Sequence, residues 1–293
     1  MSTVKSFSVG NGDMFYICHN SDNFSIIDCC LDDDNEEGII GELKRESAQK
    51  RIVRFISTHP DEDHYKGIKR LDTKMPILNF YCVKNEATKE EETESFKHYC
   101  KLRDGNKAFY ISKGCKRRWM NESNEERKTA GINIWWPNTS NSDFKEALQD
   151  AKDGIAFNNI SPVIHYSVED GVRMLWLGDL ETVFMESIEN DIALSPVHIV
   201  FAPHHGRDSG KIPNSWLDRL KPKIIVIGEA PSRHLNYYGG YDTLTQNSAG
   251  DITFDCDYAK KVHIYASNPD YAVTFLDDEH QAKFDYYIGT LNL

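Results

Sequence analysis

One short stretch constrains this chain more than any other: His59-Pro60-Asp61-Glu62-Asp63-His64. It closely follows residues 52–57, an apolar run that predicts a buried strand. Imidazole and carboxylate are the side chains that hold zinc, manganese and iron in proteins. Crowding them into one loop is unfavourable unless a cation neutralises the carboxylates. The stretch therefore predicts a metal site at the end of a strand, with a solvated acidic turn as the alternative.

The composition limits the class of protein. The 293 residues are 40% hydrophobic and 27% charged, which is typical of one large globular α/β domain or two smaller ones. The net charge of −12 argues against broad, non-specific binding of nucleic acid, but it leaves room for a local basic groove or a small anionic substrate. No apolar run is long enough to span a bilayer and no signal peptide is visible, so we expect a cytoplasmic chain without a membrane partner. Seven cysteines without a CxxC pair indicate reduced thiols.

Polar residues that can bind or orient a metal follow four predicted strands. These residues are Asp28 after residues 24–27, His59 after 52–57, Asp179 after 172–177, and His204-His205 after 197–202. Residues 160–168 and 172–177 predict a hairpin with its turn at 169–171. A turn residue or a surface histidine would explain each position alone. Because a sheet holds its strand-end loops together, their joint occurrence favours a shared site.

These motifs resemble the metallo-β-lactamase fold family, whose pattern is HxHxDH, then Gly-Asp, then later histidines. Here Asp61 replaces the middle histidine, which is similar to the branch represented by the metallo-hydrolase domain of the competence protein ComEC. The stretches that resemble this branch occur in the same order: Val9-Gly10-Asn11-Gly12-Asp13, Ile26-Ile27-Asp28, Leu177-Gly178-Asp179 and Pro203-His204-His205-Gly206. The resemblance implies an α/β fold, the αββα sandwich, as one domain over residues 1–293. Residues 85–150 are polar and rich in Lys and Glu, and we interpret them as an insertion or lid within that domain.

The resemblance also implies two divalent metal ions, zinc or manganese, and roles for individual residues. The implied ligands are His59, Asp61, Asp63, His64, Asp179 and His205. Asp179 would bridge the two ions, Asp28 and Asn159 would support the ligands, and Asp63 and His204 would take part in catalysis. The sequence leaves open which of His204 and His205 is the ligand. The branch's late histidine is missing from residues 236–241, so His234 is a candidate substitute, with a surface histidine as the alternative.

The leading hypothesis is a metal-dependent phosphodiesterase or nuclease, because a metal pair stabilises both the attacking and the leaving oxygen at phosphorus. Lys66, Arg207 and His234 are candidate substrate-binding residues. The expected partner is a phosphodiester or another small anionic substrate, with nucleic acid as one form of it; the oligomeric state is not predicted. The alternatives are hydrolysis of a small ester, lactone or phosphorylcholine-type group, and a non-catalytic metal-binding regulatory module. The basic and aromatic cluster at residues 113–119 is either an anion contact or a solvated patch.

Overall fold

Two β-sheets pack face to face in the computed structural model, which describes residues 1–168, 170–257 and 260–293. In spatial order the first sheet consists of β16 (Tyr287–Asn292), β15 (Lys261–Ala266), β14 (Ile252–Asp257), β1 (Ser2–Ser6), β2 (Phe15–Cys18), β3 (Asn23–Ile27), β5 (Ile52–Ser57), β6 (Phe80–Cys82) and β7 (Ala108–Tyr110). The second consists of β13 (Asp242–Thr245), β12 (Ile224–Ile227), β11 (Ile199–Phe201), β10 (Arg173–Trp176), β9 (Val163–Ser167) and β8 (Ile132–Trp136). A two-residue strand, β4 (Cys29–Cys30), follows β3.

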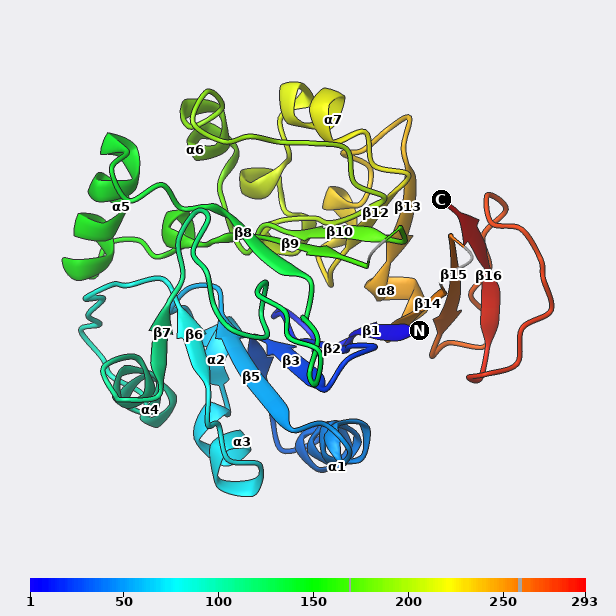
Figure 1. Ribbon diagram of the computed structural model, residues 1–293. Coiled ribbons are helices and arrows are strands. Elements are labelled where there is room, and N and C mark those ends of the chain that lie inside the picture. Colours follow the sequence, from blue (N-terminus) through cyan, green and yellow to red (C-terminus); the bar gives the residue numbers. More distant parts are fainter. Residues whose placement is uncertain (169, 258–259) are drawn as a thin grey trace.

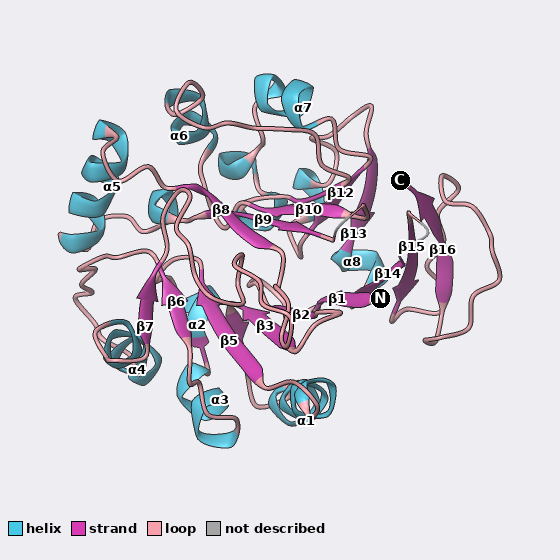
Figure 2. Ribbon diagram, in the orientation of Figure 1, coloured by secondary structure: helices cyan, strands magenta, loops and turns pink. Residues whose placement is uncertain are grey.

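Helices cover the outer face of each sheet (Figures 1 and 2). On the first sheet lie α1 (Glu36–Ser47), α2 (Glu62–Tyr65), α3 (Ile68–Lys74) and α4 (Glu94–Arg103), and on the second α5 (Ser142–Lys152), α6 (Thr182–Ser187) and α7 (Asn214–Leu220). The short α8 (Gln246–Ala249) lies between β13 and β14 along the chain. The architecture is therefore the αββα sandwich that the sequence predicts.

The two sheets are joined by buried aromatic side chains. Phe15 of β2 packs edge-on against Phe201 of β11, with ring centroids 5.0 Å apart, and against Trp176 of β10 at 6.0 Å. Trp176 and Phe201 stack at 4.6 Å. These three side chains come from strands of both sheets, so their contacts fix how the sheets face one another.

Parallel pairing brings the important strand ends to common edges. β3, β5, β6 and β7 are parallel neighbours, as are β10, β11, β12 and β13. The C-terminal ends of β3 and β5 therefore lie at one edge of the first sheet, and those of β10 and β11 at one edge of the second. This is why loops that are far apart in sequence can share a site.

Several elements depart from the sequence-based expectations. The residues within and after the His59–His64 stretch form two short helices, α2 and α3, because Gly67 adopts φ = 78° between them. The segment 85–150 contributes β7 and β8 to the edges of the two sheets, so these parts of it belong to the sandwich itself. The turn predicted at 169–171 begins at residue 169, which lies outside the described residues.

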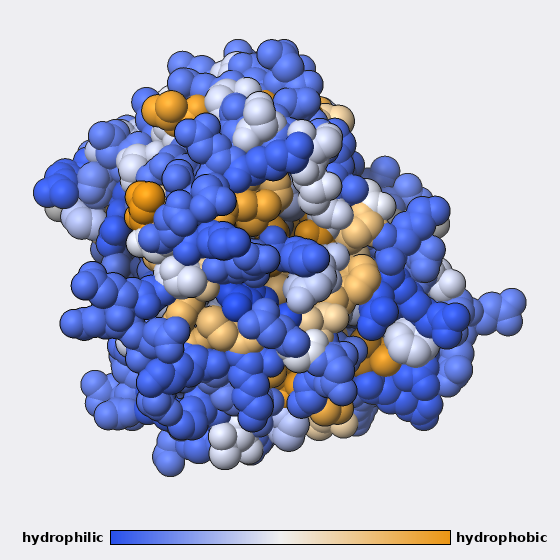
Figure 3. Space-filling view, turned by 90° about the vertical axis from the view of Figure 1, so that its left-hand side faces the viewer, coloured by the Kyte–Doolittle hydropathy of each residue, from blue (hydrophilic) through white to orange (hydrophobic). Residues whose placement is uncertain are grey.

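The surface is largely hydrophilic. On the side of the molecule that carries α4, α5 and β7, apolar side chains gather in the middle of the face and hydrophilic ones surround them (Figure 3). Among the described helices, none has both the length and the apolar character needed to cross a bilayer.

Candidate metal centre

The loop after β5 turns two imidazoles into the protein. Asp61 caps the one-turn helix α2, accepting a hydrogen bond from the backbone N–H of Glu62 at 3.0 Å. This turn brings His64 back beside His59, with ring centroids 4.1 Å apart. Both rings are buried, so neither is a solvated surface histidine.

Asp28, at the end of β3, fixes the orientation of His64. Its buried carboxylate accepts hydrogen bonds from Thr58 N at 2.8 Å, Thr58 Oγ1 at 2.6 Å and His64 Nδ1 at 2.9 Å. With Nδ1 directed at Asp28, Nε2 of His64 faces the opposite side of the ring, where it could bind a metal once deprotonated. Asp28, to which the resemblance assigns the support of a ligand imidazole, therefore contacts His64.

Asp179, after β10, lies between imidazoles from two loops, those after β5 and β11. Its Oδ1 is 3.1 Å from His64 Nε2, and its Oδ2 is 3.8 Å from Nε2 of each of His59, His204 and His205. Gly178 makes this approach possible: it has φ = 52°, and a Cβ there would lie 2.7 Å from Ser161 Oγ. Ser161 Oγ in turn accepts a hydrogen bond from Asp179 N at 3.1 Å.

The adjacent His204 and His205 point in different directions. Both have positive φ, and their ring planes are 70° apart. His205 is fully buried, with Nδ1 3.1 Å from Asp13 Oδ1 and Nε2 3.4 Å from Asp63 Oδ2. His204 is partly exposed; its Nδ1 lies 2.8 Å from Ser209 Oγ. The deeper of the two, His205, is therefore the better placed to bind a metal.

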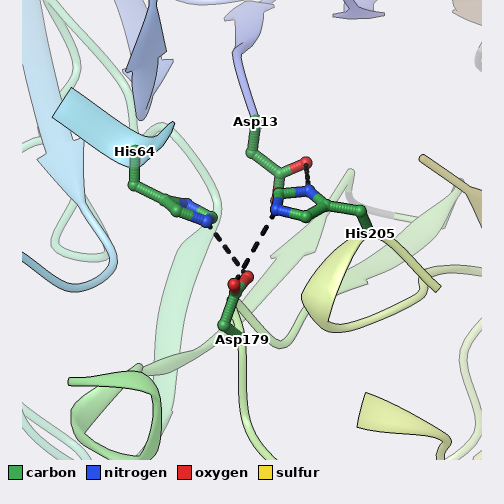
Figure 4. A group of neighbouring side chains, drawn as sticks. All are labelled: Asp13, His64, Asp179 and His205. Carbon is green, nitrogen blue, oxygen red and sulfur yellow. Dashed lines mark hydrogen bonds and ion pairs between the residues drawn. The ribbon is translucent and has the colours of Figure 1, made fainter. Parts of the chain in front are cut away.

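Asp13 joins this group although the sequence assigned it no role. It lies in the turn between β1 and β2, and its N–H donates to the carbonyl of Asp63 at 3.2 Å. Asp13, His64, Asp179 and His205 each offer one ligand atom, and these atoms all lie within 4.8 Å of one another (Figure 4). The signal was present in the Val9–Asp13 stretch, whose closing Asp was noted only as part of a resemblance.

The buried ligand atoms lack hydrogen bonds. Nε2 of His59, His64 and His205, and Oδ1 of Asp179, are buried without a hydrogen-bond partner among the described residues. Nε2 of His64 lies 3.1 Å from Oδ1 of Asp179, and Nε2 of His205 lies 3.4 Å from Oδ2 of Asp63, so these atoms face charged partners without forming hydrogen bonds. Nitrogen and carboxylate donors converging in this way suit a zinc- or manganese-like cation. The group is a candidate metal centre.

The pKa values of the side chains at the centre also indicate that its carboxylates require positive charge beside them. Burial opposes a charged His205, but Asp13 and Asp179 outweigh it and raise the pKa of His205 to about 10. Burial likewise opposes a charged Asp63, but His205 and His64 lower the pKa of Asp63 to about 2. Burial and the neighbouring His64 lower the pKa of His59 to about 4. Without a metal, protons on imidazole balance the carboxylates; a bound cation would replace those protons.

Asp61 caps a helix and forms an ion pair with a lysine. Its Oδ1 accepts a hydrogen bond from Lys89 Nζ at 2.8 Å, and none of the ion pairs among the described residues joins it to a histidine. Lys89 is itself held by aromatic rings, with Nζ 4.6 Å from the ring centroid of Phe157 and 5.5 Å from that of Tyr65. Helix capping and the Lys89 ion pair account for the position of Asp61, and its role as a ligand stays a prediction.

The remaining site residues predicted from the sequence lie around the centre or apart from it. Asn159 Nδ2 donates to Glu181 Oε2 at 2.8 Å, which braces the loop after Asp179. Arg207 reaches Asn11 and lies 3.5 Å from His204 Nε2. The side chain of Lys66 is exposed. His234 pairs with its own loop, 2.8 Å from the Tyr237 hydroxyl, and has no contact with the metal centre among the described residues.

Comparison with known proteins adds little to this geometry. No protein-family model matches the chain, and no curated protein matches its sequence. Among solved structures, the crystal structure of CmlA, a diiron β-hydroxylase from Streptomyces venezuelae, aligns with a TM-score of 0.43 at 10% identity. The alignment covers 78% of this chain and 44% of that chain, so this chain spans less than half the length of CmlA. At this level of similarity, the comparison carries no argument about the chemistry of the metal centre.

Proposed function

We propose that this chain is a metal-dependent hydrolase that cleaves phosphodiesters with the help of two divalent cations, zinc or manganese. The observation that supports the proposal most strongly is the set of buried ligand atoms on His59, His64, His205 and Asp179 that have no hydrogen bond. A buried polar group without a partner is rare in a stable protein unless a ligand satisfies it.

The proposed ligands follow from the contacts. Asp13, His64 and His205 would hold one ion together with Asp179, since their ligand atoms already cluster. His59 Nε2 lies 3.8 Å from the other oxygen of Asp179, so His59 and Asp179 would serve the second ion. Asp63 lies beside both His64 and His205 and would complete the first group. When bound, such ions lower the pKa of water and stabilise charge that develops on the phosphoryl oxygens.

The protein's own groups would position the substrate and move protons. Asp28 holds His64, and Asp13 holds His205, so both imidazoles are fixed before substrate arrives. Burial lowers the pKa of His204, which favours the neutral ring. His204 Nε2 faces Asp179 and lies near Arg207, where it could carry a proton toward a leaving oxygen. Among the described contacts of His204, Arg207 supplies the cation, and it would bind a phosphate oxygen.

A combined metal and activity assay tests the proposal. Purified protein is analysed for bound metal and then assayed on bis-p-nitrophenyl phosphate and on single-stranded DNA with added manganese. Asp63→Ala and His64→Ala should lose the metal or the activity. His280→Ala removes an exposed imidazole whose side chain is 88% accessible, and it should behave as the parent does.

The outcomes separate the alternatives. Metal-dependent cleavage of DNA that both substitutions abolish would support a nuclease. Cleavage of the small diester alone would restrict the substrate to small molecules. Bound metal without turnover on these substrates or on simple esters would favour a regulatory metal-binding module. Protein that binds no metal would refute the proposal.

A further inference from the structure

A second polar site lies at the far end of β5 from the metal centre. A pocket of about 440 Å³ opens beside Ile52, the first residue of β5, and its walls include Tyr81, Lys116, Arg117, Arg118, Trp119 and Glu122. The metal-binding loop begins after Ser57 at the other end of this strand. At about 3.3 Å per residue the two ends of β5 are roughly 17 Å apart. The basic cluster noted in the sequence therefore belongs to a separate pocket.

The charges that line this pocket are unbalanced. Lys116, Arg117 and Arg118 supply three cations, whereas Glu122 supplies one carboxylate. Within the described part of the chain, none of these four side chains takes part in an ion pair within 4.0 Å. Such a concentration of positive charge is unusual in a chain whose net charge is −12. Because no ion pair among the described residues neutralises them, the pocket is electropositive at close range.

A buried guanidinium lies directly behind the pocket. Arg54 of β5 is 1% exposed, and the partners of its two Nη atoms are uncharged: Ser25 Oγ at 3.1 Å, Asn23 Oδ1 at 2.7 Å and Trp119 O at 3.1 Å. Its Nε has no hydrogen bond. Burial and the nearby Arg117 lower the pKa of Arg54, while Tyr81 opposes that shift. A buried cation without a carboxylate is costly unless an anion compensates it.

Two residues that line the pocket, Tyr81 and Trp119, contact both Arg54 and the exposed cations. The Tyr81 ring centroid lies 5.8 Å from the Arg54 guanidinium carbon, and the Tyr81 hydroxyl accepts a hydrogen bond from Arg117 Nε at 3.4 Å. Trp119 lies between Arg118 and Arg127, at 5.8 Å and 4.8 Å from its ring. The Trp119 Nε1 atom is buried without a hydrogen bond. The cationic side chains that line the pocket are donors only, so a ligand that matches them must supply acceptors.

We propose that this pocket is a second ligand site, separate from the metal centre, that binds a phosphate group. A phosphate dianion offers three unprotonated acceptor oxygens and the negative charge to pair with Lys116, Arg117 and Arg118, and the buried Arg54 adds positive potential behind them. The volume of about 440 Å³ accommodates either inorganic phosphate or the phosphate end of a monoester. The site does not depend on the reaction that we assign to the metal centre.

Calorimetric titration of the full-length, metal-loaded protein with inorganic phosphate, and separately with adenosine monophosphate, tests the proposal. Lys116 and Arg118 are exposed, so the double substitution Lys116→Ala/Arg118→Ala should leave the fold intact. We expect it to weaken binding about tenfold or more, because hydrogen bonds to charged groups contribute that much. The matched control Lys101→Ala/Lys145→Ala removes two exposed cations outside the pocket, and binding should change less than about twofold.

A crossed variant separates this site from the metal centre. His64→Ala alters the metal centre alone, so it should retain the phosphate binding that Lys116→Ala/Arg118→Ala loses. Tighter binding of the monoester would identify a phosphorylated small molecule as the ligand, and equal or tighter binding of inorganic phosphate would identify the free anion. No binding of either probe at millimolar concentration would overturn the proposal. Binding that His64→Ala abolishes and the pocket variant keeps would also overturn it.

Discussion

Replacing Asp28 with asparagine should weaken metal binding without changing the backbone. Asp28 is buried, has φ = 57°, and accepts three hydrogen bonds, two from Thr58 and one from His64. Asparagine has the same size and tolerates positive φ, but one of its terminal atoms is a donor instead of an acceptor. In Asp28→Asn, the His64 ring therefore loses its charged partner or one Thr58 donor loses its acceptor.

The magnitude follows from the hydrogen bond that is lost. A hydrogen bond to a charged group contributes about 1.5–3 kcal/mol, and substitutions that remove the partner of a ligand imidazole typically weaken metal binding about 10–100-fold. The two estimates agree, since tenfold corresponds to about 1.4 kcal/mol. We therefore expect the dissociation constant for zinc or manganese to rise about 10–100-fold in Asp28→Asn.

Competition with a chromophoric chelator measures this dissociation constant directly. Asp34→Asn is the matched control, because Asp34 is exposed, lies in the loop before α1 and makes no side-chain contact with the metal centre. Circular dichroism checks that the variant is folded. If Asp28→Asn binds metal as tightly as Asp34→Asn does, the orientation of His64 by Asp28 is unimportant and the reasoning from hydrogen bonding fails.

Four further predictions concern the same centre. The pKa of His205 is raised to about 10 in the metal-free protein, so metal binding should release protons, and the affinity for metal should rise with pH in the range below 10. Potentiometric titration with and without metal measures the protons released. An affinity that does not change with pH would contradict this prediction. The same shift means that the ion pairs of His205 stabilise the metal-free fold below the ordinary imidazole pKa of about 6.5 and lose that effect as the pH approaches 10, which chemical denaturation across this range would detect. Gly178→Ala should lower the stability by about 1–3 kcal/mol, because φ is 52° and the added Cβ would lie 2.7 Å from Ser161 Oγ; an unchanged melting temperature would refute the close approach. Asp13→Asn should weaken metal binding more than Asp61→Asn does, since only Asp13 lies in the group of ligand atoms; the reverse order in a chelator competition would show that Asp61 turns inward when metal binds.

The sequence predicts the part of the site that depends on strand ends. Residues 52–57 form β5 as expected, and the loop that follows buries His59 and His64. Asp179 lies beside them because it follows β10, and the C-terminal end of β10 lies near that of β5 in the facing sheet. Apolar patterning specifies the strands, and parallel pairing aligns their C-terminal ends, so a local pattern carries information about a distant contact.

Contacts between loops were not predictable in the same way. His234 lies close in sequence to the family's missing histidine, yet its imidazole pairs with Tyr237 in its own loop. The Lys89 that neutralises Asp61 comes from residues 85–150, the segment that the sequence sets apart from the core. No periodicity links Lys89 to Asp61, because the position of a loop lysine depends on which aromatic rings surround it.

The structure places Asp13, and not the Asp61 of the motif, in the group of candidate ligand atoms. The motif offers Asp61, but an aspartate at this position also caps α2, and Lys89 neutralises its charge. The turn between β1 and β2 brings Asp13 against His205 instead, held there by the hydrogen bond from Asp13 N to the Asp63 carbonyl. The backbone of the metal-binding loop therefore positions a carboxylate from fifty residues earlier in the chain. A carboxylate at the centre still favours a harder cation than an all-imidazole site would, although it comes from Asp13. The position of the Asp13 carboxylate thus depends on the contact that the β1–β2 turn, which lies outside the motif, makes with Asp63.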